Sequence, residues 1–281
     1  MGANATLREV KDTGSAREDT SKLWPWPQLG PSELSQLDHI MFRRKLVCGE
    51  QAYAMGARFH SLYGIRKGTF KSVAVSQGGR EQVVAFHVPG DFIGIDGIDS
   101  DVHGCTAVAL EDAEVCGIPF ARLTELGRES PALQRTVHRI LSSHIVRQYE
   151  LIALLGCLSA EERLASFLLD YARRVARGQP LSRFDLPMSR EDIASHLGVS
   201  PETVSRAFTR LQEQGLVAVR QRRVRLLDMQ AMRARLARAG GRVPASADGP
   251  RSAMPNARVV RPVLNDPFRV LLQQACDRGK V

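Results

Sequence analysis

The spacing of apolar positions changes along the chain, and each change marks a different kind of element. Between residues 46 and 118, short apolar and β-branched runs alternate with glycine turns. The stretch SLYGIRKGTFKSVAVSQGGREQVVAFHVPGDFIG indicates consecutive hairpins. Short strands with regular turn signals predict a small barrel or jelly roll.

From residue 119 to 156 the apolar spacing becomes helical. Steps of three and four residues form a heptad seam of six positions: His138, Leu141, Ile145, Gln148, Ile152 and Leu155. A helix packed on its own barrel would explain one apolar stripe. A second stripe contains Val137, Ile140, Leu151 and Leu154. Two apolar faces predict two partners, namely the barrel and a second copy of the chain. Because the polar seam position is a neutral glutamine, we expect the dimer to form without an effector.

The segment 189–217, SREDIASHLGVSPETVSRAFTRLQEQGLV, contains start and stop signals for two helices. Ser189 can cap the first helix, and Gly198 can end it in a left-handed conformation. Ser200, followed by proline, is a suitable N-cap for the second helix, which ends before Gly215. Two helices joined by a three-residue turn have the spacing of a helix-turn-helix.

Three side chains of the second helix, Glu202, Ser205 and Arg206, share one outward face. Arg206 can donate two hydrogen bonds to guanine, and Glu202 can accept one from cytosine or orient Arg206. A solvated glutamate–arginine pair is the plain alternative. Surrounding hydroxyls and arginines, including those of a two-stranded wing at 216–228, are predicted to contact the DNA backbone: Ser189, Thr203, Thr209, Arg210, Arg220, Arg222 and Arg223.

Five blocks in a fixed order resemble the CRP/FNR family of bacterial transcription regulators over about residues 30–235. The blocks are LYGIRKGTFKS, GDFIGIDGI, EVCGIPF, SAEERLASFL and the helix-turn-helix segment. The resemblance implies an α+β fold with a cyclic-nucleotide-binding-like β-roll, a long dimerisation helix and a C-terminal winged helix-turn-helix. The Glu-x-x-Ser-Arg signature of the FNR and FixK branch implies a homodimer on the palindrome TTGAT–four bases–ATCAA. Family members also contact RNA polymerase, in part through a hairpin turn that corresponds to residues 76–81.

The predicted organisation has five parts. They are a disordered lead at 1–30, a β-roll sensor domain at 31–130, a dimerisation helix at 131–158, the DNA-binding domain at 159–235, and a linker and tail at 236–281. Within the tail, residues 265–276 have the pattern of a short amphipathic helix.

The resemblance also suggests two cofactors, and the residues favour neither. FNR holds an iron–sulfur cluster on four cysteines, but this chain has no cysteine before Cys48 and only Cys116 matches a ligand. The cyclic-nucleotide branch binds phosphate through an arginine, whereas the stretch after Asp91 has none. We therefore expect no cofactor, and Cys116 is interpreted as a small buried strand residue.

Composition narrows the functional class. The net charge of +9 and the pI of about 9.7 favour a polyanionic partner, either DNA or an acidic membrane. No apolar run approaches the ~20 residues of a membrane helix, so we expect a cytoplasmic protein without a membrane partner. The alternatives are a small-molecule-binding β-roll protein or a cupin-like enzyme with incidental nucleic-acid affinity. Because the histidines are isolated from one another, metal ligation and catalysis are not expected.

Overall fold

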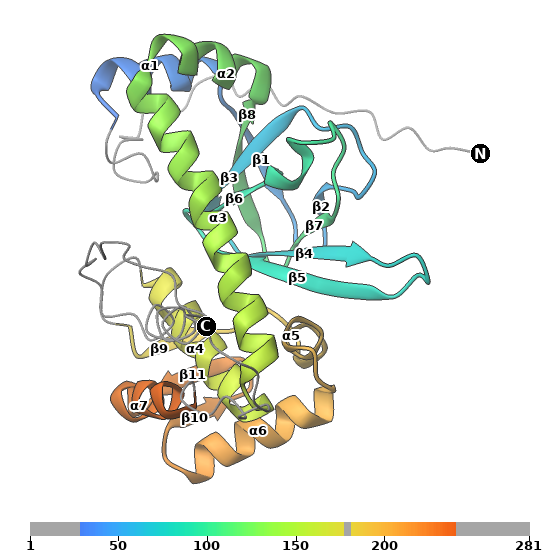
Figure 1. Ribbon diagram of the computed structural model, residues 1–281, viewed down its shortest axis with the longest axis vertical. Helices are drawn as coiled ribbons and strands as arrows, with labels where there is room; N and C mark the ends of the chain where they lie inside the picture. The colour runs from blue at the N-terminus through green and yellow to red at the C-terminus, as the bar shows by residue number, and fades with distance from the viewer. Residues whose placement is uncertain (1–28, 177–180, 240–281) are drawn as a thin grey trace, which may run out of the picture. The chain divides into compact units, whose positions relative to one another are not determined.

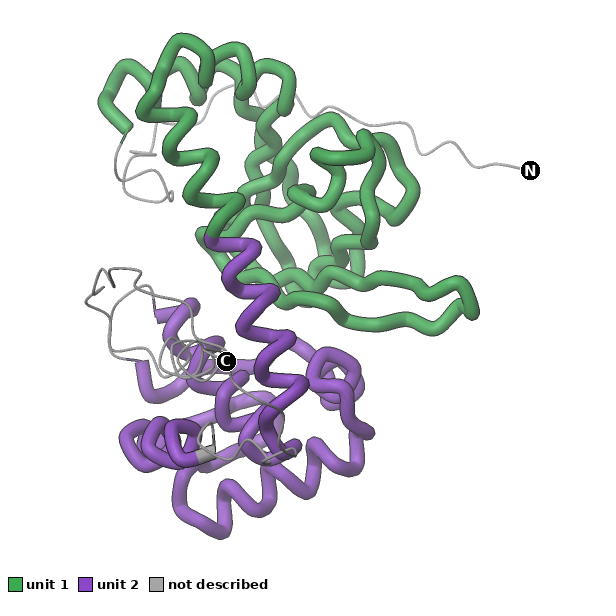
Figure 2. The backbone as a smooth tube through the Cα atoms, viewed as in Figure 1, with its two compact units in different colours: residues 1–142 green, residues 143–281 purple. Residues whose placement is uncertain are grey.

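The computed structural model describes residues 29–176 and 181–239. The chain divides into two compact units, Met1–Ser142 and Ser143–Val281 (Figure 2). The predicted lead up to residue 28 and the predicted tail helix at 265–276 lie outside the described residues.

Two four-stranded antiparallel sheets form most of the first unit, with strand orders β1-β8-β3-β6 and β2-β7-β4-β5 (Figure 1). Apolar residues from both sheets, among them Leu46, Ile65, Phe70 and Ala107, share one buried cluster between them. The predicted jelly roll is therefore confirmed. The strands are β1 Phe42–Leu46, β2 Gln51–Tyr53, β3 Ser61–Lys67, β4 Phe70–Val75, β5 Glu81–His87, β6 Phe92–Ile93, β7 Thr106–Ala109 and β8 Ala113–Pro119.

One glycine in this unit has a clear steric role. Gly68, between β3 and β4, has a φ of 83°, and a Cβ at this position would lie 2.6 Å from Cβ of Ala113. Only glycine combines a left-handed turn with so close an approach at little cost.

Helices α1 (Pro31–Ile40) and α2 (Phe120–Glu129) bury apolar side chains in a second cluster with strands β6 and β8. Leu29, which the sequence assigns to the disordered lead, belongs to this cluster and is only 8% exposed. An apolar side chain before the first helix therefore packs on the roll.

Helix α3 (Pro131–Cys157) has 27 residues, and its bounds nearly coincide with those predicted for the dimerisation helix, 131–158. Ser130 separates it from α2 and accepts a hydrogen bond from the amide of Leu133 at 3.2 Å, as an N-cap does. Leu133, Val137 and Ile140 pack in the cluster that contains α1 and α2. In the first turns of α3, one of the two predicted apolar stripes thus packs against the β-roll.

The second unit contains α4 (Ala160–Val175), α5 (Arg190–Leu197), α6 (Pro201–Glu213) and α7 (Met229–Ala239). Its three-stranded sheet has the order β10-β11-β9, with β9 Arg183–Asp185, β10 Val217–Arg220 and β11 Arg223–Leu226. Ser159 and Glu162 form a capping box at the start of α4. Helix α7 was not predicted, although Met232 and Leu236 are spaced one helical turn apart and are buried.

The side chain of Arg163 joins three segments of this unit. It donates hydrogen bonds to the carbonyls of Leu155, Leu158 and Leu197 at 2.7–2.9 Å. These carbonyls end α3 and α5, where backbone acceptors lack partners within the helix.

No described helix is long and apolar enough to cross a membrane.

Candidate nucleic-acid interface

The two helices of the predicted helix-turn-helix, α5 and α6, begin and end as the sequence indicates. Ser189 and Asp192 form a reciprocal capping box at the start of α5, and Gly198 ends it with a φ of 64°. Ser200 accepts a hydrogen bond from the amide of Thr203 at 3.2 Å, which caps α6. Gly215, with a φ of 67°, follows the end of α6. These caps orient the N-terminal half of α6.

Apolar side chains on the inner faces hold α5 against α6. Fully or nearly fully buried residues come from both helices: Ile193, Ala194, Leu197, Val204, Ala207, Phe208 and Leu211. The guanidinium of Arg190 covers the edge of this core, with its carbon 3.5 Å from the ring centroid of Phe208. Because the apolar positions face inward, the polar residues of α6 face solvent.

Glu202, Ser205 and Arg206 are all exposed on the outer face of α6. The hydroxyl of Ser205 donates to the carbonyl of Pro201 at 3.0 Å. The guanidinium of Arg206 donates to the hydroxyl of Thr203 at 3.2 Å and not to Glu202. The carboxylate and the guanidinium therefore remain separate groups, each able to meet a ligand.

The pKa of the Glu202 carboxyl is lowered, first by a hydrogen bond from its own backbone amide and then by one from Ser200. The charge of Arg206 lowers it further. This is the behaviour expected of a carboxylate at a helix N-terminus, where unpaired amides favour negative charge. Glu202 is thus an ionised acceptor at neutral pH.

The predicted backbone-contacting residues of this region lie around the same helix. Thr209 and Arg210 are exposed, whereas Ser189 and Thr203 are half-buried. Ser189 and Thr203 already make capping contacts, and Thr209 donates to the carbonyl of Ser205 at 3.2 Å. Arg210 therefore has the freest of these four side chains.

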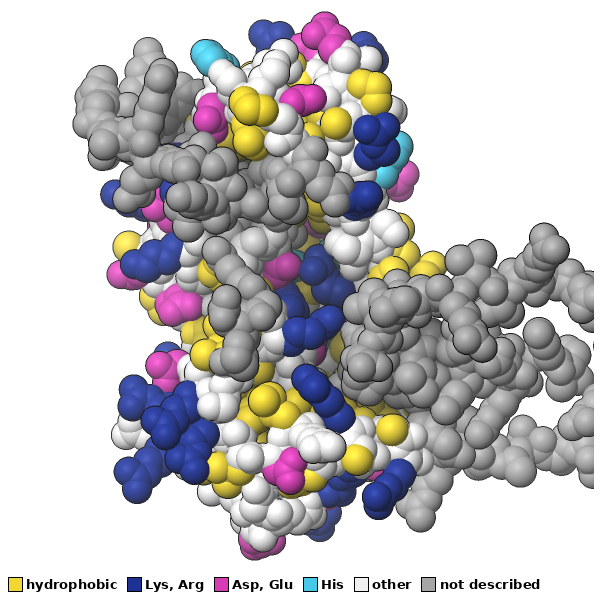
Figure 3. Space-filling view, turned by 90° about the vertical axis from the view of Figure 1, so that its left-hand side faces the viewer, with side chains coloured by type: hydrophobic (Ala, Val, Ile, Leu, Met, Phe, Trp, Pro, Cys, Tyr) yellow, Lys and Arg dark blue, Asp and Glu magenta, His cyan; other side chains and the backbone are white. Residues whose placement is uncertain are grey.

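A turn joins β10 to β11 and forms the predicted wing. Gln221 occupies it with a φ of 55°. Arg220, Arg222 and Arg223 are exposed, and Nε of Arg223 lies 3.4 Å from the carboxylate of Asp185. Figure 3 shows a dense group of lysine and arginine side chains at the lower left.

Two further arginines on this sheet, Arg183 and Arg225, were missed by the sequence analysis. Both are exposed and lie on the same face as Arg223. The alternation of arginine with buried Val224 and Leu226 in RVRL could have revealed Arg225. Arg183 could not be found in this way, because its strand has three residues.

The predicted dimer seam on α3 is partly open in the single chain. Ile145 and Ile152 are 49% and 66% exposed, and His138 is exposed too. Leu141, Gln148 and Leu155 are half-buried. Tyr149, absent from the predicted seam, is 58% exposed one turn after Ile145. A row of exposed apolar side chains is unusual on an isolated surface.

The cysteines described in the first unit differ in burial. Cys116 lies in β8 between β1 and β3, and burial raises its pKa to about 11. Cys105 is also buried, whereas Cys48 is exposed. Within the described part of the chain, no group of three or more histidine, cysteine, aspartate or glutamate residues could hold a metal ion.

Comparisons with known proteins agree with this geometry. Residues 43–130 match the cyclic nucleotide-binding domain, and residues 162–235 match the Crp-like helix-turn-helix domain. The chain is 41% identical over 202 residues to the transcriptional activator protein FnrA of Stutzerimonas stutzeri, which covers 71% of this chain and 83% of that protein. It is 40% identical over 206 residues to the anaerobic regulatory protein of Haemophilus influenzae, covering 73% and 80%.

Among solved structures, FixK2 from Bradyrhizobium japonicum superimposes with a TM-score of 0.64 and 28% identity, covering 69% of this chain and 96% of that one. The fold and the interface thus define a regulator with a cyclic-nucleotide-binding β-roll and a helix-turn-helix. The chain belongs to the CRP/FNR family of transcription regulators.

Proposed function

We propose that this protein binds the palindrome TTGAT–four bases–ATCAA as a homodimer and thereby regulates transcription initiation. The observation that carries the proposal is the outer face of α6, where Glu202, Ser205 and Arg206 are exposed beside a capped N-terminus. In helix-turn-helix proteins this half of the second helix enters the major groove. A two-fold protein requires two half-sites related by the same symmetry.

The three side chains have different roles in the proposal. Arg206 donates to guanine O6 and N7, and Glu202 accepts from the amino group of cytosine. Ser205 contacts a base edge or a phosphate. Glu202 and Arg206 do not form an ion pair with each other, so no such pair has to break before either side chain contacts a base. Arg210, Arg220, Arg222 and Arg223 hold the duplex through its phosphates.

Fluorescence anisotropy with the full-length protein, purified in air, tests this assignment. The protein should bind the palindrome more tightly than a scrambled duplex. Arg206→Ala should cost ~1–3 kcal/mol on the palindrome and relax selection at one base pair. Arg222→Ala should weaken binding to both duplexes equally and reduce the salt dependence by about one unit of slope. If the two variants behaved alike, the division into base-contacting and backbone-contacting residues would be wrong.

Dimerisation through α3 is the second part of the proposal. Ile145, Tyr149 and Ile152 are exposed on one face of a helix that packs a different stripe against the β-roll in its first turns. Gln148 is the neutral polar member of the seam, so the two copies bring no like charges together there. The expected dimer therefore forms in the absence of an effector.

Sedimentation at micromolar concentration measures this directly. The wild-type protein should sediment as a dimer and Ile152→Glu as a monomer. Ser143→Glu is the matched control. Ser143 precedes Ile152 by nine residues, which is about two and a half helical turns, so the two side chains are on opposite sides of the helix. A wild-type monomer, or equal dissociation of both variants, would contradict the seam.

The remaining parts of the proposal concern partners and chemistry. RNA polymerase is the expected protein partner, and the β4–β5 turn, closed by a hydrogen bond from the amide of Ser76 to the carbonyl of Arg80 at 3.0 Å, is one contact region. We propose no catalytic activity and neither an iron–sulfur cluster nor a cyclic nucleotide as cofactor. The protein would act in the cytoplasm, where the DNA is.

A further inference from the structure

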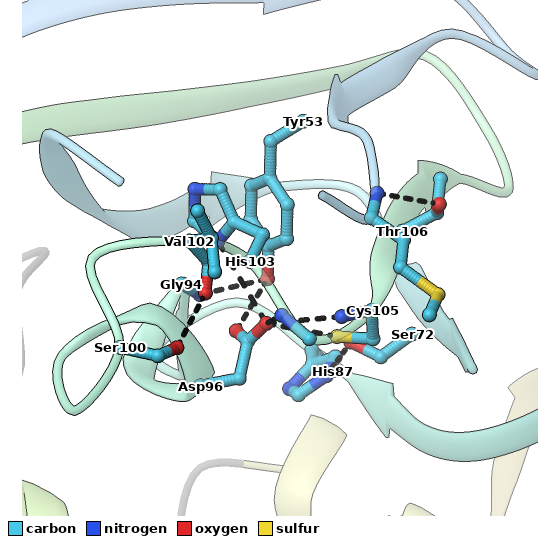
Figure 4. A network of polar contacts seen from close by, with 12 residues as sticks. Tyr53, Ser72, His87, Gly94, Asp96, Ser100, Val102, His103, Cys105 and Thr106 are labelled. Atoms are coloured by element: carbon cyan, nitrogen blue, oxygen red, sulfur yellow. Dashed lines mark hydrogen bonds and ion pairs between the residues drawn. The ribbon is translucent and has the colours of Figure 1, made fainter. Parts of the chain in front are cut away.

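A polar network ties the segment between η2 (Ile95–Gly97) and β7 to strand β2 (Figure 4). Both oxygens of the Asp96 carboxylate accept hydrogen bonds. Oδ1 accepts from the hydroxyl of Tyr53 at 3.2 Å, and Oδ2 accepts from the amides of Gly104 and Cys105 at 2.8 and 3.2 Å. The Tyr53 hydroxyl in turn accepts from the amide of Gly94 at 2.8 Å. One carboxylate and one phenol therefore hold the segment in place.

His103 lies inside this network and is only 3% exposed. Its imidazole stacks on the ring of Tyr53, with centroids 3.7 Å apart and planes 12° apart. The ring of Phe59 meets it edge-on at 5.6 Å. The backbone of His103 is also held, because its amide donates to Ala57 at 2.9 Å and its carbonyl accepts from Gly56 at 2.8 Å.

One atom of this well-packed ring is unsatisfied. Nδ1 of His103 is buried and has no hydrogen-bond partner, and the closest carboxylate oxygen, Oδ2 of Asp96, is 3.7 Å away. Native structures leave few buried polar atoms without a partner, because each one costs about 1–3 kcal/mol. Such an atom on a titratable ring next to a carboxylate is a site where a proton can bind.

The charged neighbours of His103 come from several elements. Asp96 of η2 attracts a proton to it, and His60, before β3, repels one. Tyr53 of β2 and Cys105 stay neutral in acid, because burial raises both pKa values, that of Cys105 to about 12. His87 of β5 is paired with Ser72, 2.9 Å from its Nε2. Burial outweighs the attraction of Asp96, so the pKa of His103 lies below its ordinary value.

We propose that neutral His103 holds the segment between η2 and β7 closed. When the His103 imidazole takes up a proton from solvent, the segment is released. In the closed segment a protonated imidazole would be a charge in a nearly dry site. In the open segment the same charge is hydrated. The released segment loses the hydrogen bonds that the amides of Gly104 and Cys105 donate to Asp96.

The direction with pH follows from linkage. The open segment protonates at the ordinary histidine pKa of about 6.5, and the closed one protonates at a lower pH. The closed state has its full stability at pH values above the ordinary histidine pKa. It becomes less stable as the pH drops from there toward the pKa of His103 in the closed state. The ring centroids of Phe59 and Phe120 are 5.3 Å apart, and Phe59 shares a cluster with Leu133 near the start of α3. Opening therefore removes the contact between the rings of His103 and Phe59 beside the start of α3.

The test is amide hydrogen exchange of the full-length protein, corrected for intrinsic rates, together with an NMR titration of the His103 ring. On acidification the amides of Gly104 and Cys105 should lose protection. The limiting loss should be about tenfold for each pH unit by which the measured pKa lies below the ordinary value. His103→Gln should abolish this loss, and the matched control His39→Gln, at an exposed histidine of α1, should retain it.

Two results would overturn the proposal. The first is a His103 pKa at or above the ordinary value in the wild-type protein. The second is an acid-induced loss of protection that persists in His103→Gln. If His103→Gln does not fold, the wild-type protein alone still decides, because its measured pKa and its loss of protection must agree in size. This test does not depend on DNA binding or on dimerisation.

Discussion

Arg183 on β9 and Arg225 on β11 lie directly opposite each other in the sheet of the second unit, with both side chains exposed. Like charges opposite each other on neighbouring strands repel and destabilise the pair. The neighbouring Arg223 is different, because it faces Asp185 on one side and Arg220 on the other. A repulsive pair on the sheet that carries the wing is consistent with a polyanionic partner.

Removal of one member of this pair should stabilise the free protein. Arg225→Thr is expected to raise the free energy of unfolding by ~0.2–1 kcal/mol at low salt, because the repulsion from Arg183 is lost. The gain should shrink at high salt, where exposed charges are screened. Urea unfolding at two salt concentrations measures it. Arg223→Thr is the matched control on the same strand, and its attraction and repulsion should nearly offset each other. Equal gains for both variants would argue against a specific pair.

The N-cap of α6 should be separable from the base contacts proposed for this helix. Ser200→Ala removes the acceptor for the Thr203 amide and should lower the free energy of unfolding by ~0.5–2 kcal/mol. Ser200→Asn should restore most of this, because asparagine is an equally good N-cap. Thermal unfolding followed by circular dichroism provides the measurement. If Asn failed to rescue the loss, the hydroxyl of Ser200 would have another role, for example toward Glu202.

Arg163 should be a main support of the second unit. Arg163→Met keeps most of the aliphatic length but leaves the carbonyls of Leu155, Leu158 and Leu197 without their donor. The expected loss is about 3 kcal/mol, since charged donors contribute more than neutral ones and buried acceptors are costly to leave unpaired. Arg173→Met is the control, because its side chain is exposed on α4. A small loss for Arg163→Met in denaturant titrations would show that water replaces the guanidinium.

The thiols should fall into two classes of reactivity. Cys48 and Cys157 are exposed and should be alkylated by iodoacetamide at neutral pH. Cys105 and Cys116 are buried, with pKa values raised to about 12 and about 11, so almost no thiolate is present at neutral pH. Their alkylation should stay slow until the pH approaches those values or the protein unfolds. Peptide mapping by mass spectrometry distinguishes all five cysteines. Rapid modification of Cys105 in the native protein would show that its strand opens readily.

Much of the DNA-binding region could be predicted from the sequence, because its signals are local. Ser189, Gly198 and Ser200 act on backbone groups within one turn of themselves, so a short stretch of residues determines where α5 and α6 begin and end. The apolar spacing then decides which side of α6 faces solvent. The outward placement of Glu202 and Arg206 needed no tertiary information.

Other features depended on contacts between distant parts of the chain. The lead was predicted to reach residue 30, yet Leu29 is buried against residues far away in the sequence. Helix α7 was missed, although Asp228 caps its start by accepting a hydrogen bond from the amide of Ala231 at 2.8 Å; the burial of Met232 and Leu236 that holds it in place is a tertiary feature. Exposure of Tyr149 beside the seam likewise became visible only when the packed face of α3 was known.

The sequence by itself determined the order of the elements, the caps of the helix-turn-helix and the chemistry of its outer face, since these follow from propensities and spacings over a few residues. Only the tertiary structure decided that Arg183 meets Arg225 and that His103 is enclosed by Tyr53, Phe59 and Asp96. Strand register and loop closure bring together residues that are tens of positions apart. Burial, and with it the pKa of a histidine, is a property of that assembly and not of the local sequence.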